Sequence, residues 1–297
     1  MDLKIIVHEN RKSFHLFGLT LNDFFNKYKY LFDNLVFNNE KIVNNVRIID
    51  LSDEENIEIF YKKYGFKMKQ CPDFEYDIGN DFYNKIIFKK YPNFNFKGKT
   101  IFDFGANSGM DALCWAESVG SSGKVISFEP NETIFKNLSH NVEVNNKFDN
   151  IVLYKKALYY HNGFVNFSNE LTQGGFIVGK KIDTLEENEL INLRNSQIGS
   201  NVEKIQVECT TINKLVNEGL KPDIIKIDIE GAEYDLINYD SFIEAIKIKS
   251  IFIFELHSVE RCKKDIDKLI NYFKLNDYSC ESFHSELMGE HLGFYPN

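Results

Sequence analysis

The fold is decided by the stretch Ile101-Phe-Asp-Phe-Gly-Ala-Asn-Ser-Gly109. An apolar strand is predicted to end near Phe104, and the glycines that follow favour a sharp turn into a helix over 110–119. Because glycine has no Cβ, a turn of this kind lets a ligand approach the backbone closely. The candidate ligand-contacting residues of this turn are Gly105, Ala106, Asn107, Ser108 and Gly109.

From Thr100 onward, apolar strands alternate with helices, which predicts a parallel sheet covered on both faces. Two further strand segments near the C-terminus, 278–283 and 291–295, predict an antiparallel hairpin at the sheet edge. We therefore expect an α/β fold with a Rossmann-like, seven-stranded, mostly parallel sheet and an antiparallel C-terminal hairpin. The other expected strands are 100–104, 125–129, 151–156, 224–228 and 250–255, with helices over 110–119, 132–145, from 232 onward and over 260–275.

The segment between the third and fourth strands is too long for a simple crossover. We expect an extra strand over 162–169, a helix over 184–195 and another strand over 204–209. Such an insertion would lie near the carboxyl edge of the sheet, where ligands bind in this class of fold. The long part of it, 180–203, bears on which substrate is recognised.

The first 97 residues have mixed signals and no catalytic motif. Short strands are expected over 3–7, 14–18 and 46–51. Capping residues predict helices over 21–35, over 52–65 and over 81–90. We therefore divide the chain into an α+β cap or oligomerisation region, residues 1–97, and a catalytic domain, residues 98–297. The chain could also form a homo-oligomer.

The formal net charge of −9 and the lack of a dense Lys/Arg block disfavour nucleic acid as the main substrate. The five cysteines are scattered and form no C-x-x-C pair, which argues against a disulfide framework or a structural zinc site and suits a reducing compartment. No signal peptide and no apolar stretch of 18 residues is found. We expect a cytoplasmic protein without a membrane span.

Two acidic residues end neighbouring strands of the expected sheet. Glu129 closes the second strand, where a carboxylate can accept hydrogen bonds from both ribose hydroxyls of a nucleoside. Asp103 closes the first strand and would lie beside a cationic group, such as the α-amino group of a methionine moiety. The dinucleotide fingerprint requires two further glycines where this chain has Asn107 and Met110, and one of them serves the pyrophosphate. The loop therefore favours S-adenosylmethionine, which has no phosphate, over NAD.

A second acidic group follows the fourth strand. Strand alternation places Lys226 and Asp228 on one face, and Glu230 and Glu233 lie in the turn to the next helix. These carboxylates could hold a cation, position a substrate hydroxyl, or raise one another's pKa. The alternative is that Glu230 and Glu233 favour the helix N-terminus and that Lys226 pairs with an acid. His257 follows the fifth strand on the same rim and could serve as a base or a substrate ligand.

With these motifs in order over about residues 99–258, the chain resembles the FkbM-like family of class I S-adenosylmethionine-dependent methyltransferases. The resemblance implies O-methylation, often of a sugar, a glycan or another small hydroxyl acceptor. The matching stretches are the glycine loop 102–109, Phe128-Glu-Pro130 with Asn141 and Asn145, Lys156-Ala-Leu158, the signature Asp223–Glu233 and the strand ending Ile253–His257.

The resemblance and the residues together assign a site. Asp228, Glu230 and His257 would face the acceptor, and no residue is assigned to a metal, although metal assistance through Asp228 and Glu230 stays open. An NAD(P)-dependent oxidoreductase and a non-catalytic nucleoside-binding module are the alternatives. The expected cofactor contacts are Asp103, Gly105, Ala106, Asn107, Ser108, Gly109, Glu129, Pro130, Ala157 and Asp228.

Overall fold

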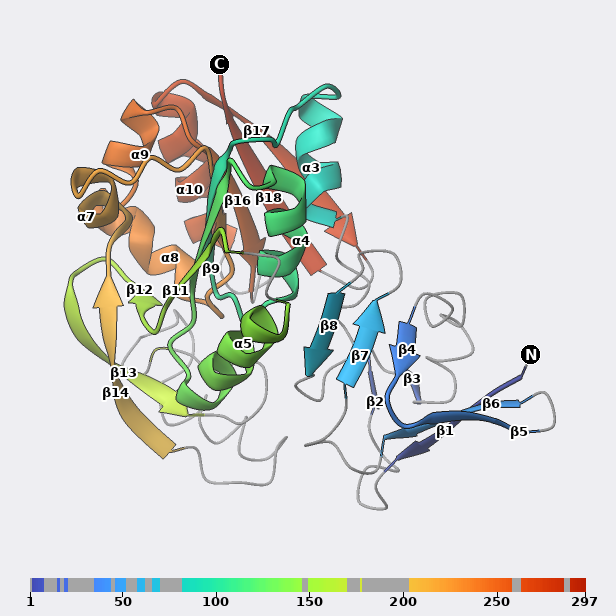
Figure 1. Ribbon diagram of the computed structural model, residues 1–297. Coiled ribbons are helices and arrows are strands. Elements are labelled where there is room, and N and C mark those ends of the chain that lie inside the picture. The colour runs from blue at the N-terminus through green and yellow to red at the C-terminus, as the bar shows by residue number, and fades with distance from the viewer. Residues whose placement is uncertain are drawn as a thin grey trace.

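A seven-stranded sheet forms the centre of the protein, in the order β11-β10-β9-β15-β16-β18-β17 (Figure 1). The first five strands run parallel, and β18 is antiparallel to both β16 and β17. The strands are β9 (Thr100–Phe104), β10 (Lys124–Phe128), β11 (Ile151–Tyr154), β15 (Ile224–Ile227), β16 (Ile251–Leu256), β17 (Tyr278–Ser285) and β18 (Gly289–Pro296). The predicted Rossmann-like sheet with its C-terminal hairpin is confirmed.

The computed structural model describes most residues from 82 onward, with its longest gap over 178–202, and the first 81 residues only in short segments. The described residues are 2–7, 15–16, 19–20, 35–43, 46–51, 58–61, 66–69, 82–145, 149–169, 177, 203–257, 263–285 and 289–297.

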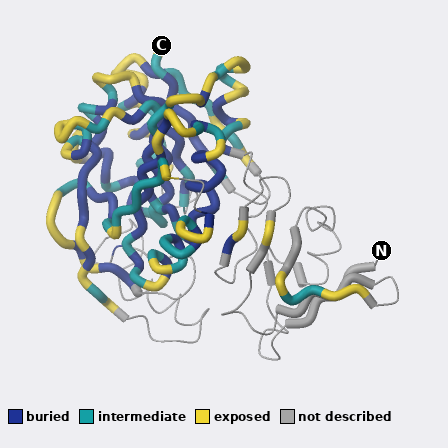
Figure 2. The backbone as a smooth tube through the Cα atoms, viewed as in Figure 1, coloured by how far each residue is buried: buried dark blue, intermediate teal, exposed yellow. Residues whose placement is uncertain are grey.

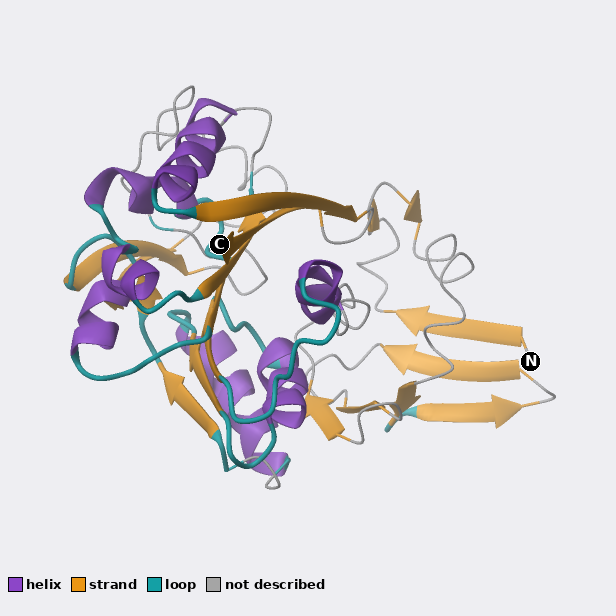
Figure 3. Cartoon of the chain, turned by 90° about the horizontal axis from the view of Figure 1, so that it is seen from above, coloured by secondary structure: helices purple, strands orange, loops and turns teal. Residues whose placement is uncertain are grey.

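Helices lie on both faces of the central sheet (Figures 1 and 3). Since both faces are covered, apolar side chains on opposite faces of one strand are both buried: Ile101 and Phe102 of β9 are each fully buried. On the side of the C-terminal helices, Phe273 stacks on Phe294 with ring centroids 4.2 Å apart. The helices are α3 (Phe82–Lys90), α4 (Met110–Val119), α5 (Glu132–Val144), α7 (Ile212–Asn217), α8 (Glu233–Leu236), η4 (Ile237–Tyr239), α9 (Ile243–Lys247) and α10 (Lys263–Leu275).

The insertion forms a second, three-stranded sheet in the order β12-β14-β13. Its strands are β12 (Ala157–Leu158), β13 (Gly163–Asn169) and β14 (Glu203–Thr210), and β13 runs antiparallel to β14. The extra strands expected over 162–169 and 204–209 are confirmed. The helix expected over 184–195 lies outside the described residues.

The N-terminal region contributes short strands and one helix. The strands expected over 3–7 and 46–51 and the helix over 81–90 are confirmed. The helix expected over 52–65 is wrong where the structure describes it, because Glu58–Tyr61 forms a strand. This segment pairs with β4 (Leu35–Phe37) on one side and β8 (Phe66–Lys69) on the other, and this strand pairing overrides the local capping signal. The helix expected over 21–35 falls on residues outside the described set, except Leu35, which opens a strand.

The described N-terminal strands are β1 (Asp2–Val7), β2 (His15–Leu16), β3 (Leu19–Thr20), β4 (Leu35–Phe37), β5 (Glu40–Val43), β6 (Val46–Leu51), β7 (Glu58–Tyr61) and β8 (Phe66–Lys69).

Parts of this region pack on the central sheet. In α3, Tyr83, Ile86 and Ile87 are buried, and Tyr295 Oη donates to the Ile86 carbonyl at 2.9 Å. Figure 2 shows the buried backbone concentrated in the central sheet and the helices beside it. The division at residue 97 stays a prediction.

Among the described residues, the structure has no helix with the length and apolar character needed to cross a membrane.

Candidate functional site

The glycine loop is folded tightly against the end of β15. Gly105, Asn107 and Gly109 all have left-handed backbone, with φ of 79°, 49° and 95°. The Gly105 and Ala106 amides both donate to the Phe128 carbonyl at 3.0 Å. A Cβ on Gly105 would lie 1.7 Å from the Asp228 carbonyl oxygen, so only glycine fits there. The loop thus brings the ends of β9, β10 and β15 together.

Glu129 is held at the end of β10 by backbone amides. Its Oε2 accepts from the Asn107 N–H at 3.0 Å and its Oε1 from the Asn131 N–H at 2.8 Å. Each carboxylate oxygen has capacity for a second hydrogen bond. Burial raises the pKa of Glu129 to about 7, although the two amides favour the charged form. Glu129 is therefore a preorganised acceptor whose charge changes near neutral pH.

A pocket that is partly open to solvent lies over these strand ends. Its lining combines apolar side chains with amide and carboxylate groups, a mixture suited to a ligand with an aromatic ring and polar substituents. The pocket is lined by Gly105, Asn107, Glu129, Pro130, Asn131, Ile134, Lys156, Ala157, Leu158, Phe167, Ile177, Asp228, Ile229 and Glu230.

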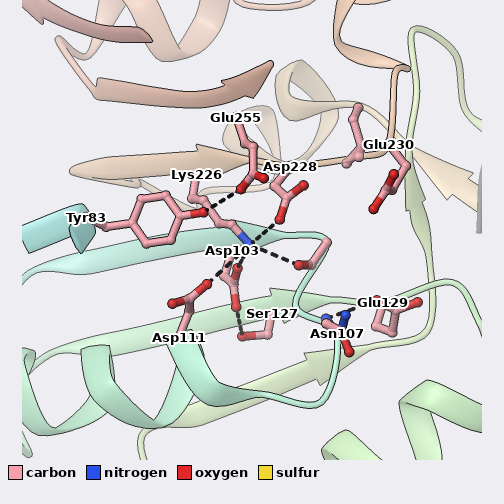
Figure 4. Close-up of polar contacts among 12 residues, drawn as sticks. Tyr83, Asp103, Asn107, Asp111, Ser127, Glu129, Lys226, Asp228, Glu230 and Glu255 are labelled. Carbon is pink, nitrogen blue, oxygen red and sulfur yellow. Dashed lines mark hydrogen bonds and ion pairs between the residues drawn. The ribbon is translucent and has the colours of Figure 1, made fainter. Parts of the chain in front are cut away.

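Beneath the pocket, Lys226 is buried among carboxylates (Figure 4). Its Nζ lies 3.1 Å from Asp228 Oδ2, 3.4 Å from Asp111 Oδ2 and 3.5 Å from Asp103 Oδ1, and it donates to the Gly105 carbonyl at 3.0 Å. Burial alone would lower the pKa of Lys226, but the nearby carboxylates outweigh it and hold that pKa well above its usual value. Lys226 is therefore a permanent cation that links the glycine loop to Asp228.

The acids around Lys226 do not all carry a charge at neutral pH. Burial raises the pKa of Asp111 to about 7 and also raises the pKa of Asp103, while Lys226 acts in the opposite direction on both. Three carboxylates share one ammonium group, so the cluster retains a proton near neutrality.

Asp103 lies below the pocket and does not line it. Its carboxylate is fully buried, 3.5 Å from Lys226 Nζ, and Oδ2 accepts from Ser127 Oγ at 3.1 Å. The expected contact between Asp103 and a ligand amino group has no support in this geometry, because the carboxylate faces the buried lysine. Asp228, on the next strand, does reach the pocket.

His257 lies at the end of β16 among carboxylates of other elements. Its Nδ1 is 3.1 Å from Glu233 Oε1, and its Nε2 is 3.6 Å from Glu230 Oε2 and 3.8 Å from Asp228 Oδ1. Burial lowers the pKa of His257, but the carboxylates of Glu230, Glu233 and Asp228 outweigh it and raise it well above 6.5. Without another cation, His257 is an imidazolium at neutral pH and cannot accept a proton.

The structure brings most of the predicted site residues together. Pro130, Ala157, Asp228 and Glu230 line the pocket beside the loop and Glu129. Ala106, Ser108 and Gly109 do not line it but shape the loop, and the Ser108 carbonyl accepts from Asn141 Nδ2 at 2.9 Å. Sequence reasoning left Glu233 undecided, and the structure places it against His257. Among the described residues, Asp228, Glu233 and His257 are a group whose ligand atoms lie within 4.8 Å of one another, as a metal site requires.

Several wall residues have no signal in the sequence. Phe167 and Ile177 both come from the insertion, and an isolated β-bridge joins them. Asp111 and Tyr83 also meet the Lys226 cluster, Tyr83 from a helix outside the predicted domain. Only the folding of the insertion and of α3 onto the sheet brings Phe167, Ile177 and Tyr83 to the site.

The chain is similar to one protein family and to several solved structures. A family profile described as the methyltransferase FkbM domain matches residues 103–280. The chain is similar to the structure of methyltransferase FkbM from Methylobacillus flagellatus KT, with 13% identity and a TM-score of 0.48 over 76% of this chain, but it spans only 56% of that chain. It is similar to an O-methyltransferase from Bacillus cereus in complex with SAH, at 14% identity and a TM-score of 0.42 over 73% of this chain and 80% of that one. It is also similar to a SAM-dependent O-methyltransferase from Thermotoga maritima, at 14% identity and a TM-score of 0.41. That match covers 88% of this chain and 91% of that one. No curated protein matches the chain.

Proposed function

The chain belongs to the FkbM methyltransferase domain family, and from this premise we propose that it transfers a methyl group from S-adenosylmethionine to a hydroxyl of a sugar, a glycan or another small metabolite. The observation that carries the proposal is Glu129, a buried carboxylate anchored by two backbone amides in the wall of the pocket. A carboxylate held in this way can accept hydrogen bonds from the two hydroxyls of a ribose.

The residues of the pocket fit an adenosine compound. Gly105 and Asn107 of the glycine loop line the pocket beside Asp228. Ile134, Leu158 and Phe167 offer an apolar wall for a flat ring. Asp228 and Glu230 supply negative charge for a cationic ligand, which both the amino group and the sulfonium of S-adenosylmethionine provide.

When bound, S-adenosylmethionine supplies a methyl group on a sulfonium sulfur, and its carbon–sulfur bond breaks as the acceptor oxygen bonds to the methyl carbon. Holding the two reactants in line contributes about 7–11 kcal/mol of barrier reduction. The proton of the acceptor hydroxyl passes to a carboxylate oxygen of Asp228 or Glu230, the acids that line the pocket. Such a base contributes roughly 10²–10⁴-fold in rate.

Two alternatives make different predictions. An NAD(P)-dependent oxidoreductase binds a dinucleotide, so equilibrium dialysis of the full chain should show S-adenosylmethionine binding tightly and NAD not. Tight NAD binding would overturn the proposal. A non-catalytic nucleoside-binding module binds the donor without turnover, so incubation with labelled donor and a panel of hydroxylated acceptors separates the two. We expect label in an acceptor.

Removing the Glu129 carboxylate should weaken donor binding. For Glu129→Ala we expect a loss of about 1.5–3 kcal/mol in the binding free energy, as for hydrogen bonds to a charged group. Titration calorimetry with S-adenosylhomocysteine measures it. Glu132→Ala is the matched control, because Glu132 is a nearby acid outside the pocket lining that pairs with lysines at the surface. Unchanged affinity in a folded Glu129→Ala variant removes Glu129 from the site.

The raised pKa of Glu129 predicts a pH dependence of binding. The ionised carboxylate is the better acceptor of hydrogen bonds from ribose hydroxyls. With a pKa of about 7 in the pocket without ligand, Glu129 becomes protonated as the pH falls through neutrality. Affinity should therefore be roughly tenfold weaker at pH 6 than at pH 8. The dissociation constant of S-adenosylhomocysteine across this range is the measurement. Glu129→Gln, which does not titrate, should flatten the profile; a variant that keeps the slope assigns the titration to another group.

A further inference from the structure

We propose that Asp228, Glu233 and His257 form a binding site for one divalent metal cation at the edge of the pocket. Each of the three offers a ligand atom within 4.8 Å of the other two. They come from three elements that converge at the carboxyl edge of the sheet, since Asp228 ends β15, Glu233 opens α8 and His257 follows β16. Tyr234 Oη donates to the His257 carbonyl at 2.7 Å and ties α8 to the end of β16.

The separations around the imidazole are those of ligands that share a cation. His257 Nε2 lies 3.6 Å from Glu230 Oε2, 3.8 Å from Asp228 Oδ1 and 4.0 Å from Glu255 Oε1. These distances are too long for hydrogen bonds. Two ligands each ~2.1 Å from a metal ion are about 3.0–4.2 Å apart, depending on the angle between them. A cation shared by the imidazole and a neighbouring carboxylate fits these separations.

Glu233 has an oxygen left for such a cation. The residue is fully buried, and its Oε1 accepts from the Ile229 N–H at 3.0 Å and lies 3.1 Å from His257 Nδ1. Its Oε2 is buried without a hydrogen-bond partner among the residues that the structure describes. A buried carboxylate oxygen without a partner is costly, and a metal ion would satisfy it.

The local charge favours a cation as well. Four carboxylates, those of Asp228, Glu230, Glu233 and Glu255, lie within 4.0 Å of the His257 ring nitrogens. Lys226 contacts Asp228 through Oδ2, whereas Oδ1 faces His257. One imidazole with carboxylate oxygens suits an ion such as Mn²⁺, which takes both nitrogen and oxygen ligands.

The role of the cation rests on the proposed function, whereas its binding does not. Asp228 belongs both to this group and to the pocket wall. A cation held there would lie beside the acceptor hydroxyl, orient it and lower its pKa, so that the proton leaves more readily. With a metal ion bound to its imidazole, His257 is neutral, and the positive charge of the ion replaces that of the imidazolium.

The test uses the full chain, freed of metal with a chelator and desalted. Mn²⁺ is titrated in, and the free ion is followed by its electron paramagnetic resonance signal. We expect one Mn²⁺ bound per chain, with affinity at least ~10-fold weaker in Glu233→Gln and in His257→Gln. Asp267→Asn, an exposed acid on α10, is the control and should bind as the natural chain does. His257 is partly exposed, so its variant keeps the test valid where Glu233→Gln fails to fold.

The outcomes separate this site from the proposed function. No stoichiometric Mn²⁺ binding, or binding unchanged in both folded variants, overturns the metal site, and methyl transfer that continues in chelator then leaves the function standing. Stoichiometric Mn²⁺ binding that both variants lose supports the site even where neither S-adenosylhomocysteine binding nor methyl transfer is found, a result that would instead count against the proposed function.

Discussion

Gly105→Ala is expected to cost about 2–5 kcal/mol of folding free energy and to abolish donor binding. The new Cβ would lie 1.7 Å from the Asp228 carbonyl oxygen, a distance that no relaxation of a side chain can relieve. Pushing the glycine loop away from the end of β15 costs about 1–3 kcal/mol of folding free energy. The left-handed backbone at φ 79° adds roughly 1–2 kcal/mol of strain once residue 105 carries a Cβ. The amide of Asp228 donates to the Phe104 carbonyl at 3.1 Å, so moving the two strands apart also breaks the edge of the sheet that forms the pocket floor.

Gly219→Ala is the matched control. Gly219 also has positive φ, 99°, but a Cβ there meets no atom within 4 Å. Only the backbone strain remains, about 1–2 kcal/mol, and donor binding should be unchanged. Denaturant unfolding and dialysis with S-adenosylmethionine measure both quantities. Equal losses in the two variants would mean that the close approach of Gly105 to β15 does not matter for the pocket.

Lys226→Met is expected to destabilise the protein by about 3–5 kcal/mol, as when one partner of a buried ion pair is removed. The ammonium group is buried and lies within 3.5 Å of the carboxylates of Asp103, Asp111 and Asp228. Methionine fills a similar volume but leaves these acids uncompensated, and the Gly105 carbonyl also loses its donor. Urea unfolding measures the loss. Lys247→Met, which breaks only a surface pair with Glu244, should cost no more than about 1 kcal/mol.

The deficit of Lys226→Met should depend on pH with a definite sign. Burial raises the pKa of Asp111 from its ordinary 3.8 to about 7 even with Lys226 present, and the pKa of Asp103 is also raised. A carboxyl whose pKa is raised on folding binds more protons in the folded state, so its contribution to stability is full below the unfolded pKa and is lost as the pH rises through the folded pKa. Removing Lys226 raises both pKa values further. The variant should therefore lose least near pH 5 and most near pH 8; a deficit that is constant over this range would contradict the buried cluster.

The local sequence was enough to predict the frame of the site. The limits of β9 and α4 follow the apolar run and the glycine turn, because both are set by neighbours along the chain. Glu129 was found for the same reason, as a carboxylate that closes a buried strand. The helix expected over 52–65 failed at Glu58–Tyr61, where pairing with strands distant in the sequence outweighs local capping.

By itself, the sequence determined the succession of the strands of the central sheet along the chain, the glycine loop and the strand-end positions of Asp103, Glu129 and Asp228. Only the tertiary structure decided where those carboxylates point. Asp103 faces Lys226 beneath the pocket, and Glu233 meets His257 from another element. Periodicity tells which face of a strand a residue occupies. A buried charge, however, needs a partner that offsets its loss of hydration, and that partner lies on a neighbouring strand or helix. Which groups become partners is therefore decided only when the sheet is assembled.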